Sequence, residues 1–435
     1  MYDLLIEEVN GKRKNKTLEK EVIWKDLSLK GKYDDVRFRK YCSDLLKMIE
    51  KYMSQEVYEN TPLQQATYLI EAVGRKKMEK LYNTAMKTAR MHSEQQPFRH
   101  SEYYYFQYDI EKKYYEMAQQ ELKRSEKSNV EKIANNLDIF YLSEKLRLFS
   151  SVINQQSFIS HEYQLLFVDE IVNHIKKMDY YEVPPIALYY QVYLTSTESD
   201  NLQHYYKLKE LLDKYGLSFP RSEALSLYYS AINYSIRKIN SGDQTFLNEL
   251  FDLYNDLVSK EIIFINDELS PWDFKNITVL ALRLKKYAWT EDFILRYNEK
   301  LPPAFRENAV TYNLAQLYFY QKKYDSVIEQ LRNVEYEDMT YNLNSKAMLL
   351  ATYYELDEVE PLYSLIDSFG AYLNRHKDIA SEKRKDYVNL IRFTKKLLKV
   401  NPSDKKALEA LKLEVQATKR LASPNWLLEK IAELE

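Results

Sequence analysis

Glycine, a residue type on which many nucleotide-binding and hydrolase sites depend, is scarce in this sequence. The six glycines stand at positions 11, 31, 74, 216, 242 and 370. Phosphate-binding loops and dinucleotide fingerprints need glycines a few residues apart, and the nucleophile elbow needs two glycines around a serine. These spacings are absent from the sequence, which excludes the enzymes built on those motifs.

The histidines and the single cysteine also lack the spacing of a metal or nucleophilic site. His161-Glu162 begins like a zinc-protease motif, but Leu165 stands where the second histidine is needed. Cys42 falls on an apolar helical pattern with Phe38 and Leu45, which indicates a small buried side chain. We therefore expect a protein without catalytic activity, cofactor or metal.

Basic residues are concentrated between positions 75 and 99, a segment that contains seven Lys and Arg residues and only two acidic residues. If this segment is one helix, four of them share a face: Lys76, Lys80, Lys87 and Arg90. Such a stripe would bind nucleic acid or an acidic protein surface, and a solvated helix face is the other interpretation. The net charge of -2 argues against a general polyanion-binding protein.

Tyrosine is the most unusual feature of the composition, with forty tyrosines against six glycines. Few glycines favour long helices joined by short polar turns. A tyrosine ring and hydroxyl suit the edge of a core close to solvent. Packing is the favoured interpretation, because large exposed apolar patches are uncommon on soluble proteins. An exposed aromatic recognition surface is the alternative.

Helix starts are marked by proline after a capping residue. They occur at Thr61-Pro62, Ser270-Pro271, Asn401-Pro402 and Ser423-Pro424, and Gln64 completes a capping box after Thr61. Between these points apolar residues recur every three or four positions, and no segment shows convincing strand alternation. The sequence predicts an all-α fold of roughly twenty helices.

The stretch TYNLAQLYFYQKKYDSVIEQL, residues 311–331, belongs to a repeat. A forward shift of 35 positions sets Leu314 on Leu349, Tyr318 on Tyr353 and Val327 on Leu362. A backward shift of 34 positions sets Leu280 on Leu314, Leu284 on Tyr318 and Phe293 on Val327. This period is typical of stacked helical hairpins, and the repeats are clearest over 275–377.

The apolar skeleton of this stretch resembles the tetratricopeptide repeat (TPR). The residues that carry the resemblance are Leu314-Ala315, Tyr318, Tyr324, Val327 and Leu331. Two features depart from the pattern: Lys322 occupies the turn position where a small residue is expected, and Val327 and Leu362 replace an alanine. The resemblance implies a right-handed α-solenoid of TPR-like hairpins. We expect it over residues 131–435, after a helical N-terminal region, residues 1–130.

A wider resemblance is carried by WKDL, KYDDVRFRKYCSDLLKMIEKYM, LSPWDFKNI and LPPAFRENAVTYNLAQLYF. These stretches resemble a group of uncharacterised bacterial helical-repeat proteins. The resemblance implies a bacterial origin, and further helical sequence before the equivalent of Met1.

The TPR resemblance also implies which residues face a partner. They are Tyr312, Gln316, Phe319, Tyr320, Asn344, Tyr354 and Glu355. Some repeats of this family hold a peptide carboxylate with paired lysine and asparagine residues. Here Tyr312, Gln316, Ala347 and Ala351 occupy the equivalent positions and only Asn313 is kept. An aromatic groove for apolar or extended segments is therefore expected.

We interpret the chain as a non-enzymatic helical-repeat scaffold for protein–protein or protein–peptide interaction. The alternative is a nucleic-acid-associated regulator that uses the basic helix near 75–90. A single cysteine cannot form an internal disulfide, which favours a reducing compartment. The longest uncharged stretch, residues 183–197, is too short to span a bilayer. We expect a cytoplasmic protein without membrane contact.

Overall fold

The computed structural model describes residues 19–27, 32–118, 128–156, 163–331 and 339–435. Within these ranges it contains twenty α-helices, two short 3-10 helices and no strand, so the predicted all-α fold is confirmed. The described residues include no helix with both the length and the apolar character that crossing a bilayer requires. His161 and Glu162 of the partial zinc motif lie outside the described ranges.

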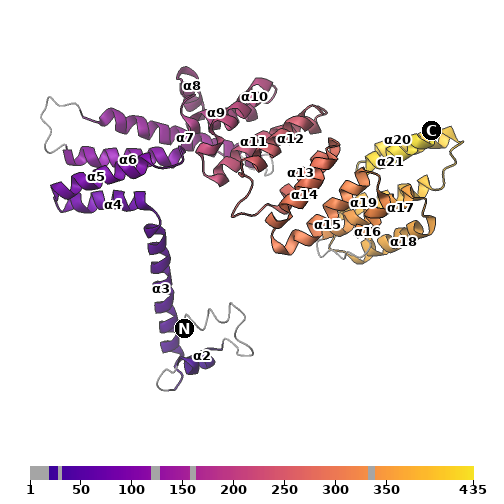
Figure 1. Ribbon diagram of the computed structural model, residues 1–435, viewed down its shortest axis with the longest axis horizontal. Coiled ribbons are helices and arrows are strands. Elements are labelled where there is room, and N and C mark those ends of the chain that lie inside the picture. Colours follow the sequence, from indigo (N-terminus) through magenta and orange to yellow (C-terminus); the bar gives the residue numbers. More distant parts are fainter. Residues whose placement is uncertain (1–18, 28–31, 119–127, 157–162, 332–338) are drawn as a thin grey trace. The chain divides into compact units, whose positions relative to one another are not determined.

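The chain divides into two compact units, residues 1–187 and 188–435. The first unit contains α2 (Lys20–Asp26), α3 (Asp35–Glu59), α4 (Pro62–Arg75), α5 (Glu79–Glu94), α6 (Ser101–Ala118), α7 (Val130–Gln156) and α8 (Val168–Lys177). Helices α4, α5 and α6 pack side by side, and α6 packs along α7 (Figure 1). The boundary expected near residue 130 would separate α7 from α6. The observed division falls instead within α9 (Pro184–Thr197).

The second unit continues from α9 as a series of helix pairs. Its other helices are α10 (Leu202–Tyr215), α11 (Arg221–Asn240), α12 (Phe246–Ser259), α13 (Pro271–Arg283), α14 (Tyr287–Tyr297), α15 (Pro303–Tyr320), α16 (Tyr324–Leu331), α17 (Met339–Glu355), α18 (Val359–Arg375), α19 (Ser381–Leu397), α20 (Lys405–Ala417) and α21 (Pro424–Leu434). Helices α13, α15 and α17 each pack on the next helix and on the helix after it. In this pattern each helix pair packs against the next pair along the chain.

Three of these pairs share the same turn. The second residue after the first helix has a left-handed backbone in each: Lys285 (φ 57°), Lys322 (φ 60°) and Asp357 (φ 57°). Its N–H bonds a carbonyl three residues back, and the next N–H bonds a carbonyl five residues back. This pair of hydrogen bonds is a common way to end a helix, and glycine normally occupies the left-handed position. The left-handed backbone explains why a small residue is expected at this position, which Lys322 occupies at some cost.

The turns also fix the register of the repeats. Tyr318 and Tyr353 accept the equivalent bond from Lys323 and Glu358, which agrees with the predicted shift of 35. In the preceding pair the equivalent acceptor is Ala281, 37 positions before Tyr318. The predicted shift of 34 is therefore wrong by almost one helical turn. Buried Thr290, not Phe293, is the counterpart of Val327.

Three of the four predicted helix starts are observed, and the one at Asn401-Pro402 is wrong because α20 begins at Lys405. Pro62, Pro271 and Pro424 each begin a helix, and Ser270 accepts a hydrogen bond from the backbone N–H of Trp272. The capping box at Thr61 is wrong. Its hydroxyl donates to the carbonyls of the preceding helix at Val57 and Tyr58, so it does not cap α4.

Tyrosines fill much of the core of the second unit. Tyr205, Tyr228 and Tyr234 are fully buried, and the rings of Tyr205 and Tyr234 stack with centroids 5.1 Å apart. The buried hydroxyls find partners at the rim of the core, such as Ser199 O for Tyr234 at 2.7 Å. Other tyrosines, including Tyr206 and Tyr320, remain exposed. Packing and surface roles thus both occur.

Candidate functional site: an aromatic pocket in the second unit

A pocket of about 720 Å³ opens between α15, α17, α19 and the start of α21. Its lining includes Tyr312, Gln316, Phe319 and Tyr320 from α15, Asn344, Ala347, Ala351 and Glu355 from α17, Tyr387 from α19 and Trp426 from α21. The small side chains of Ala347 and Ala351 leave the space that the aromatic rings surround. Six of the seven residues expected to face a partner therefore lie around one cavity.

The aromatic walls of the pocket are rigid parts of the core. Tyr312 is only 3% exposed and packs edge-on against Tyr341, with ring centroids 5.1 Å apart. Tyr387 and Trp426 are also buried. Tyr320, at 42% exposed, is the aromatic residue of α15 that reaches the rim. Tyr312 thus shapes the pocket from within and does not project from the surface.

Two carboxamides from neighbouring helices, Gln316 and Asn344, contribute polar atoms to the pocket wall. Gln316 donates from Nε2 to the Tyr312 hydroxyl at 3.1 Å, but its buried Oε1 accepts no hydrogen bond from any described residue. Asn344 accepts from the Tyr387 hydroxyl at 2.7 Å through Oδ1. A buried acceptor without a donor costs about 1–3 kcal/mol. A ligand N–H would remove that cost once the Gln316 side chain turns this enclosed oxygen toward the cavity.

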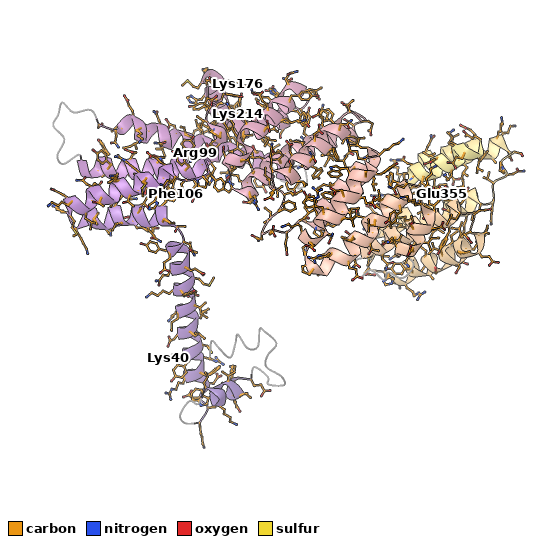
Figure 2. All side chains as sticks on the ribbon, viewed as in Figure 1. Lys40, Arg99, Phe106, Lys176, Lys214 and Glu355 are labelled. Carbon is orange, nitrogen blue, oxygen red and sulfur yellow. The ribbon has the colours of Figure 1, made fainter. Side chains whose placement is uncertain are left out.

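Glu355 holds the pocket together from one side; Figure 2 labels it at the end of α17. Its carboxylate accepts from the Trp426 indole at 2.8 Å and pairs with Lys430 at 2.9 Å. The side chains of Glu355 and Lys430 are 13% and 4% exposed, so the pair is shielded from water. Burial raises the pKa of Tyr324 to about 12, and the charge and hydrogen bond of Glu355 contribute. Through its contacts with Trp426 and Lys430, Glu355 anchors α21 to α17.

Tyr354 does not line the pocket. Its ring packs perpendicular to Trp426, with centroids 5.5 Å apart, and burial raises the pKa of its hydroxyl. It supports the wall that Trp426 forms. Tyr354 is therefore the one expected residue outside the pocket lining. It precedes Glu355 on α17, and consecutive residues of a helix point in different directions.

Sequence reasoning missed Tyr387 and Trp426, which complete the pocket. They come from helices well after the clear repeats, and helical periodicity within one segment does not specify which distant helices meet. A partial signal was available, since the Ser423-Pro424 helix start placed Trp426 at the beginning of a helix. The chain just before α21 is held next to α19 by Ala422, whose N–H donates to the Asp386 carbonyl at 3.0 Å.

The basic stripe in the first unit is not one helix. Lys77 adopts a left-handed backbone (φ 53°), which ends α4 after Arg75, and α5 begins at Glu79. Lys76 therefore lies on a turn, while Lys80 and Lys87 are exposed on α5. Arg90 pairs with the buried carboxylate of Glu111 at 3.1 Å. The prediction that one helix carries all four basic residues is therefore wrong.

The predicted apolar setting of Cys42 is only partly observed. The thiol is half-buried, and it packs at the edge of a cluster formed by Ile23, Trp24 and Phe38. Across the described ranges no group of three or more His, Cys, Asp or Glu side chains is arranged to hold a metal ion.

Three comparisons with known proteins found no relative of this chain. No family model matches the chain, and neither a curated protein nor a solved structure matches it. The geometry of the pocket is therefore the basis for a functional proposal.

Proposed function

We propose that this chain is a non-enzymatic helical-repeat scaffold that binds a protein or peptide segment in the aromatic pocket. The observation that carries the proposal is the unpaired buried Oε1 of Gln316 in a cavity lined by aromatic rings. An extended peptide presents alternating N–H and C=O groups, which suit the two carboxamides, while its side chains suit the rings.

The charges of the pocket favour an uncharged segment. The lining includes two lysines and three carboxylates, and Glu355 is already neutralised by Lys430. Neither sign dominates, so an anionic or strongly basic peptide gains little here. This balance favours an apolar or mixed segment over a free carboxylate terminus.

We further propose that the second unit is a right-handed α-solenoid of TPR-like hairpins. The shared turns at Lys285, Lys322 and Asp357 support this assignment, as does the packing of α13, α15 and α17 on the helices two places along. In such arrays each hairpin is covered by its neighbours, which leaves one face of the first helices for partners. A cytoplasmic location accords with the single half-buried cysteine.

The nucleic-acid alternative has less support. Arg90 is committed to Glu111, and the remaining basic residues are divided between a turn and a helix. We therefore keep partner binding as the proposed function.

The test is selection of short random peptides on the full chain at high salt, where surface charge is screened. Enriched peptides are then titrated against the wild type and the Gln316→Ala/Asn344→Ala variant. Two lost hydrogen bonds predict about tenfold weaker binding. The control is Asn248→Ala/Gln416→Ala, which removes two exposed carboxamides outside the pocket. Equal affinity for all three proteins would overturn the proposal.

A further inference from the structure

A second groove in this unit has a different chemistry from the aromatic pocket. It encloses about 770 Å³ between α19 and α20, and no residue lines both cavities. Both helices pack against α21, and Val400 lies in the connection between them. The two sites can therefore be altered independently.

The floor of the groove is aliphatic. Val388 and Ile391 from α19 face Ala407, Ala410 and Leu411 from α20. Alanines on one wall leave room for a helix backbone to approach closely, since interhelical distance depends on the side chains at the contact. Val388 remains exposed at the groove, so the floor is open to a partner.

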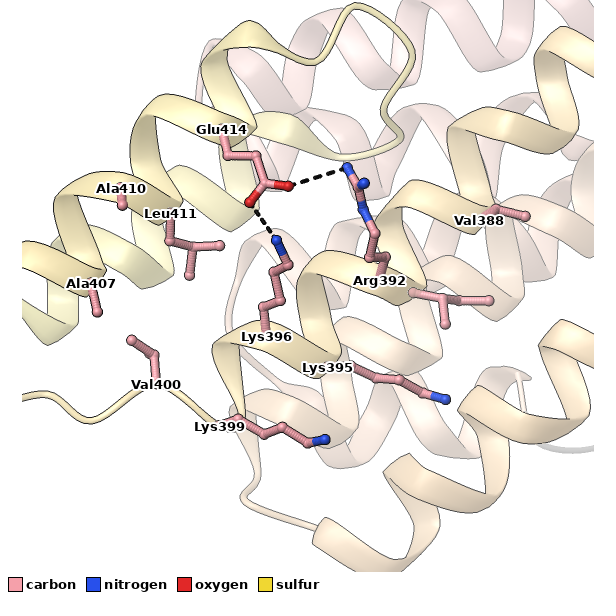
Figure 3. A pocket seen from close by; sticks show the side chains of 11 residues that line it. Val388, Arg392, Lys395, Lys396, Lys399, Val400, Ala407, Ala410, Leu411 and Glu414 are labelled. Carbon is pink, nitrogen blue, oxygen red and sulfur yellow. Dashed lines mark hydrogen bonds and ion pairs between the residues drawn. The ribbon is translucent and has the colours of Figure 1, made fainter.

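One edge of the groove is strongly basic. Four cations line it, Arg392, Lys395, Lys396 and Lys399, against the single carboxylate of Glu414. Figure 3 shows Glu414 between Arg392 and Lys396, with Lys395 and Lys399 directed away from it. Glu414 lies 3.7 Å from Arg392 and 2.5 Å from Lys396, so one carboxylate serves two cations.

The other two cations are weakly compensated. Lys395 lies 3.6 Å from Asp367, but Asp367 is highly exposed, and such surface pairs contribute about 0–1 kcal/mol. Lysines in the last turn of a helix also balance its dipole, which accounts for Lys395 and Lys396. The helix dipole does not account for Arg392, which lies more than one turn before the end of α19, or for Lys399, which lies beyond that end.

We propose that this groove binds an acidic amphipathic helix of a partner protein. The apolar stripe of that helix would cover the aliphatic floor, and its Asp or Glu residues would meet Lys395 and Lys399. The stretch from Val388 to Lys399 rises about 16 Å, which matches roughly three turns of a bound helix. An aliphatic floor without stacking aromatic residues favours a peptide over a single-stranded nucleic acid, whose bases bind aromatic rings.

The experiment is a second selection of random peptides on the full chain, carried out at low salt. The expected consensus has excess Asp and Glu with apolar residues at helical spacing. The leading peptide is then titrated against the wild type, Lys395→Glu/Lys399→Glu and the matched reversal Lys405→Glu/Lys406→Glu, whose lysines are exposed on α20 outside the groove. Ala410→Gln tests the floor by filling it without changing charge.

We expect at least tenfold weaker binding to Lys395→Glu/Lys399→Glu, several-fold weaker binding to Ala410→Gln, and less than a twofold change for the matched reversal. The Gln316→Ala/Asn344→Ala variant should bind this peptide normally, which separates the result from the pocket proposal. An enriched consensus without acidic excess would overturn the inference. Equal loss in both charge reversals, or tighter binding of a single-stranded oligonucleotide than of the peptide, would also overturn it.

Discussion

The indole of Trp426 on α21 donates a hydrogen bond to the carboxylate of Glu355 on α17, 71 positions earlier in the chain, at 2.8 Å. Lys430, one turn after Trp426, pairs with the same carboxylate. This contact brings the last helix of the chain against the repeats and closes the aromatic pocket. The site therefore depends on the docking of α21.

Removing the indole donor should loosen α21. Trp426→Phe keeps an aromatic wall but leaves Glu355 with one donor fewer, at a cost of about 1.5–3 kcal/mol for a bond to a charged group. Hydrogen exchange of residues 424–434 measures this opening directly. The control is Trp272→Phe, because Trp272 is exposed on α13. Unchanged exchange in α21 would show that the contact does not hold it.

Breaking the buried ion pair should cost more. Lys430→Met removes the cation but leaves the Glu355 charge buried, which predicts a loss of about 3 kcal/mol in the free energy of unfolding of the second unit. Adding Glu355→Gln should restore part of it. Lys412→Met, which breaks a more exposed pair with Glu435, should cost under about 1 kcal/mol in the same urea titration. Similar losses for both lysines would contradict this account.

Acid should destabilise the first unit through Glu111. Burial alone would raise the pKa of Glu111, but hydrogen bonds from Lys132, Asn129 and Arg90 outweigh it and lower the pKa. Its contribution is therefore complete above the unfolded value of about 4.3 and is lost as pH falls toward the lowered folded pKa.

Glu111→Gln should flatten the pH dependence of unfolding in that range. Exposed Glu79, which opens α5, provides the control substitution Glu79→Gln. Thermal unfolding followed between pH 3 and 7 makes the comparison, with the pH range chosen around the carboxyl titration. A Glu111→Gln curve parallel to the wild type would rule out this role.

The helical turns predict different effects for two neighbouring lysines. Lys322 has a left-handed backbone, so Lys322→Gly should stabilise the second unit by about 1 kcal/mol. Lys323, the next residue, lacks that conformation and directly precedes α16, where glycine is accepted, so Lys323→Gly should change stability by less than about 0.5 kcal/mol. Urea unfolding of the two variants compares them, and equal shifts would contradict the turn assignment.

The helices and the shift of 35 positions between α15 and α17 could be predicted because they depend on local apolar spacing. The register of the first clear repeat could not. Thr290 satisfies its hydroxyl by donating to the Lys286 carbonyl at 2.8 Å, and so occupies a buried position that pattern matching assigned to Phe293. One left-handed residue, Lys77, likewise divides a segment whose composition resembled a single helix.

The site was predictable on one side only. The TPR resemblance implied that Gln316, Phe319 and Asn344 face a partner, and these residues line one cavity. Tyr387 and Trp426 reach it through the packing of α19 and α21, which depends on contacts between segments far apart in the chain. Spacing alone also does not separate Tyr354 from Glu355, since the two are adjacent on α17.

The affinity of a peptide selected on the aromatic pocket is the measurement that tests the central proposal most directly. Its dissociation constant is compared for the wild type, Tyr320→Ala/Asn344→Ala, and Tyr363→Ala, in which a tyrosine of similar exposure on α18 is removed outside the pocket. Pocket binding predicts about tenfold or greater weakening for the double variant and less than a twofold change for Tyr363→Ala. Unchanged affinity in a folded double variant would contradict the proposal that this pocket holds the partner.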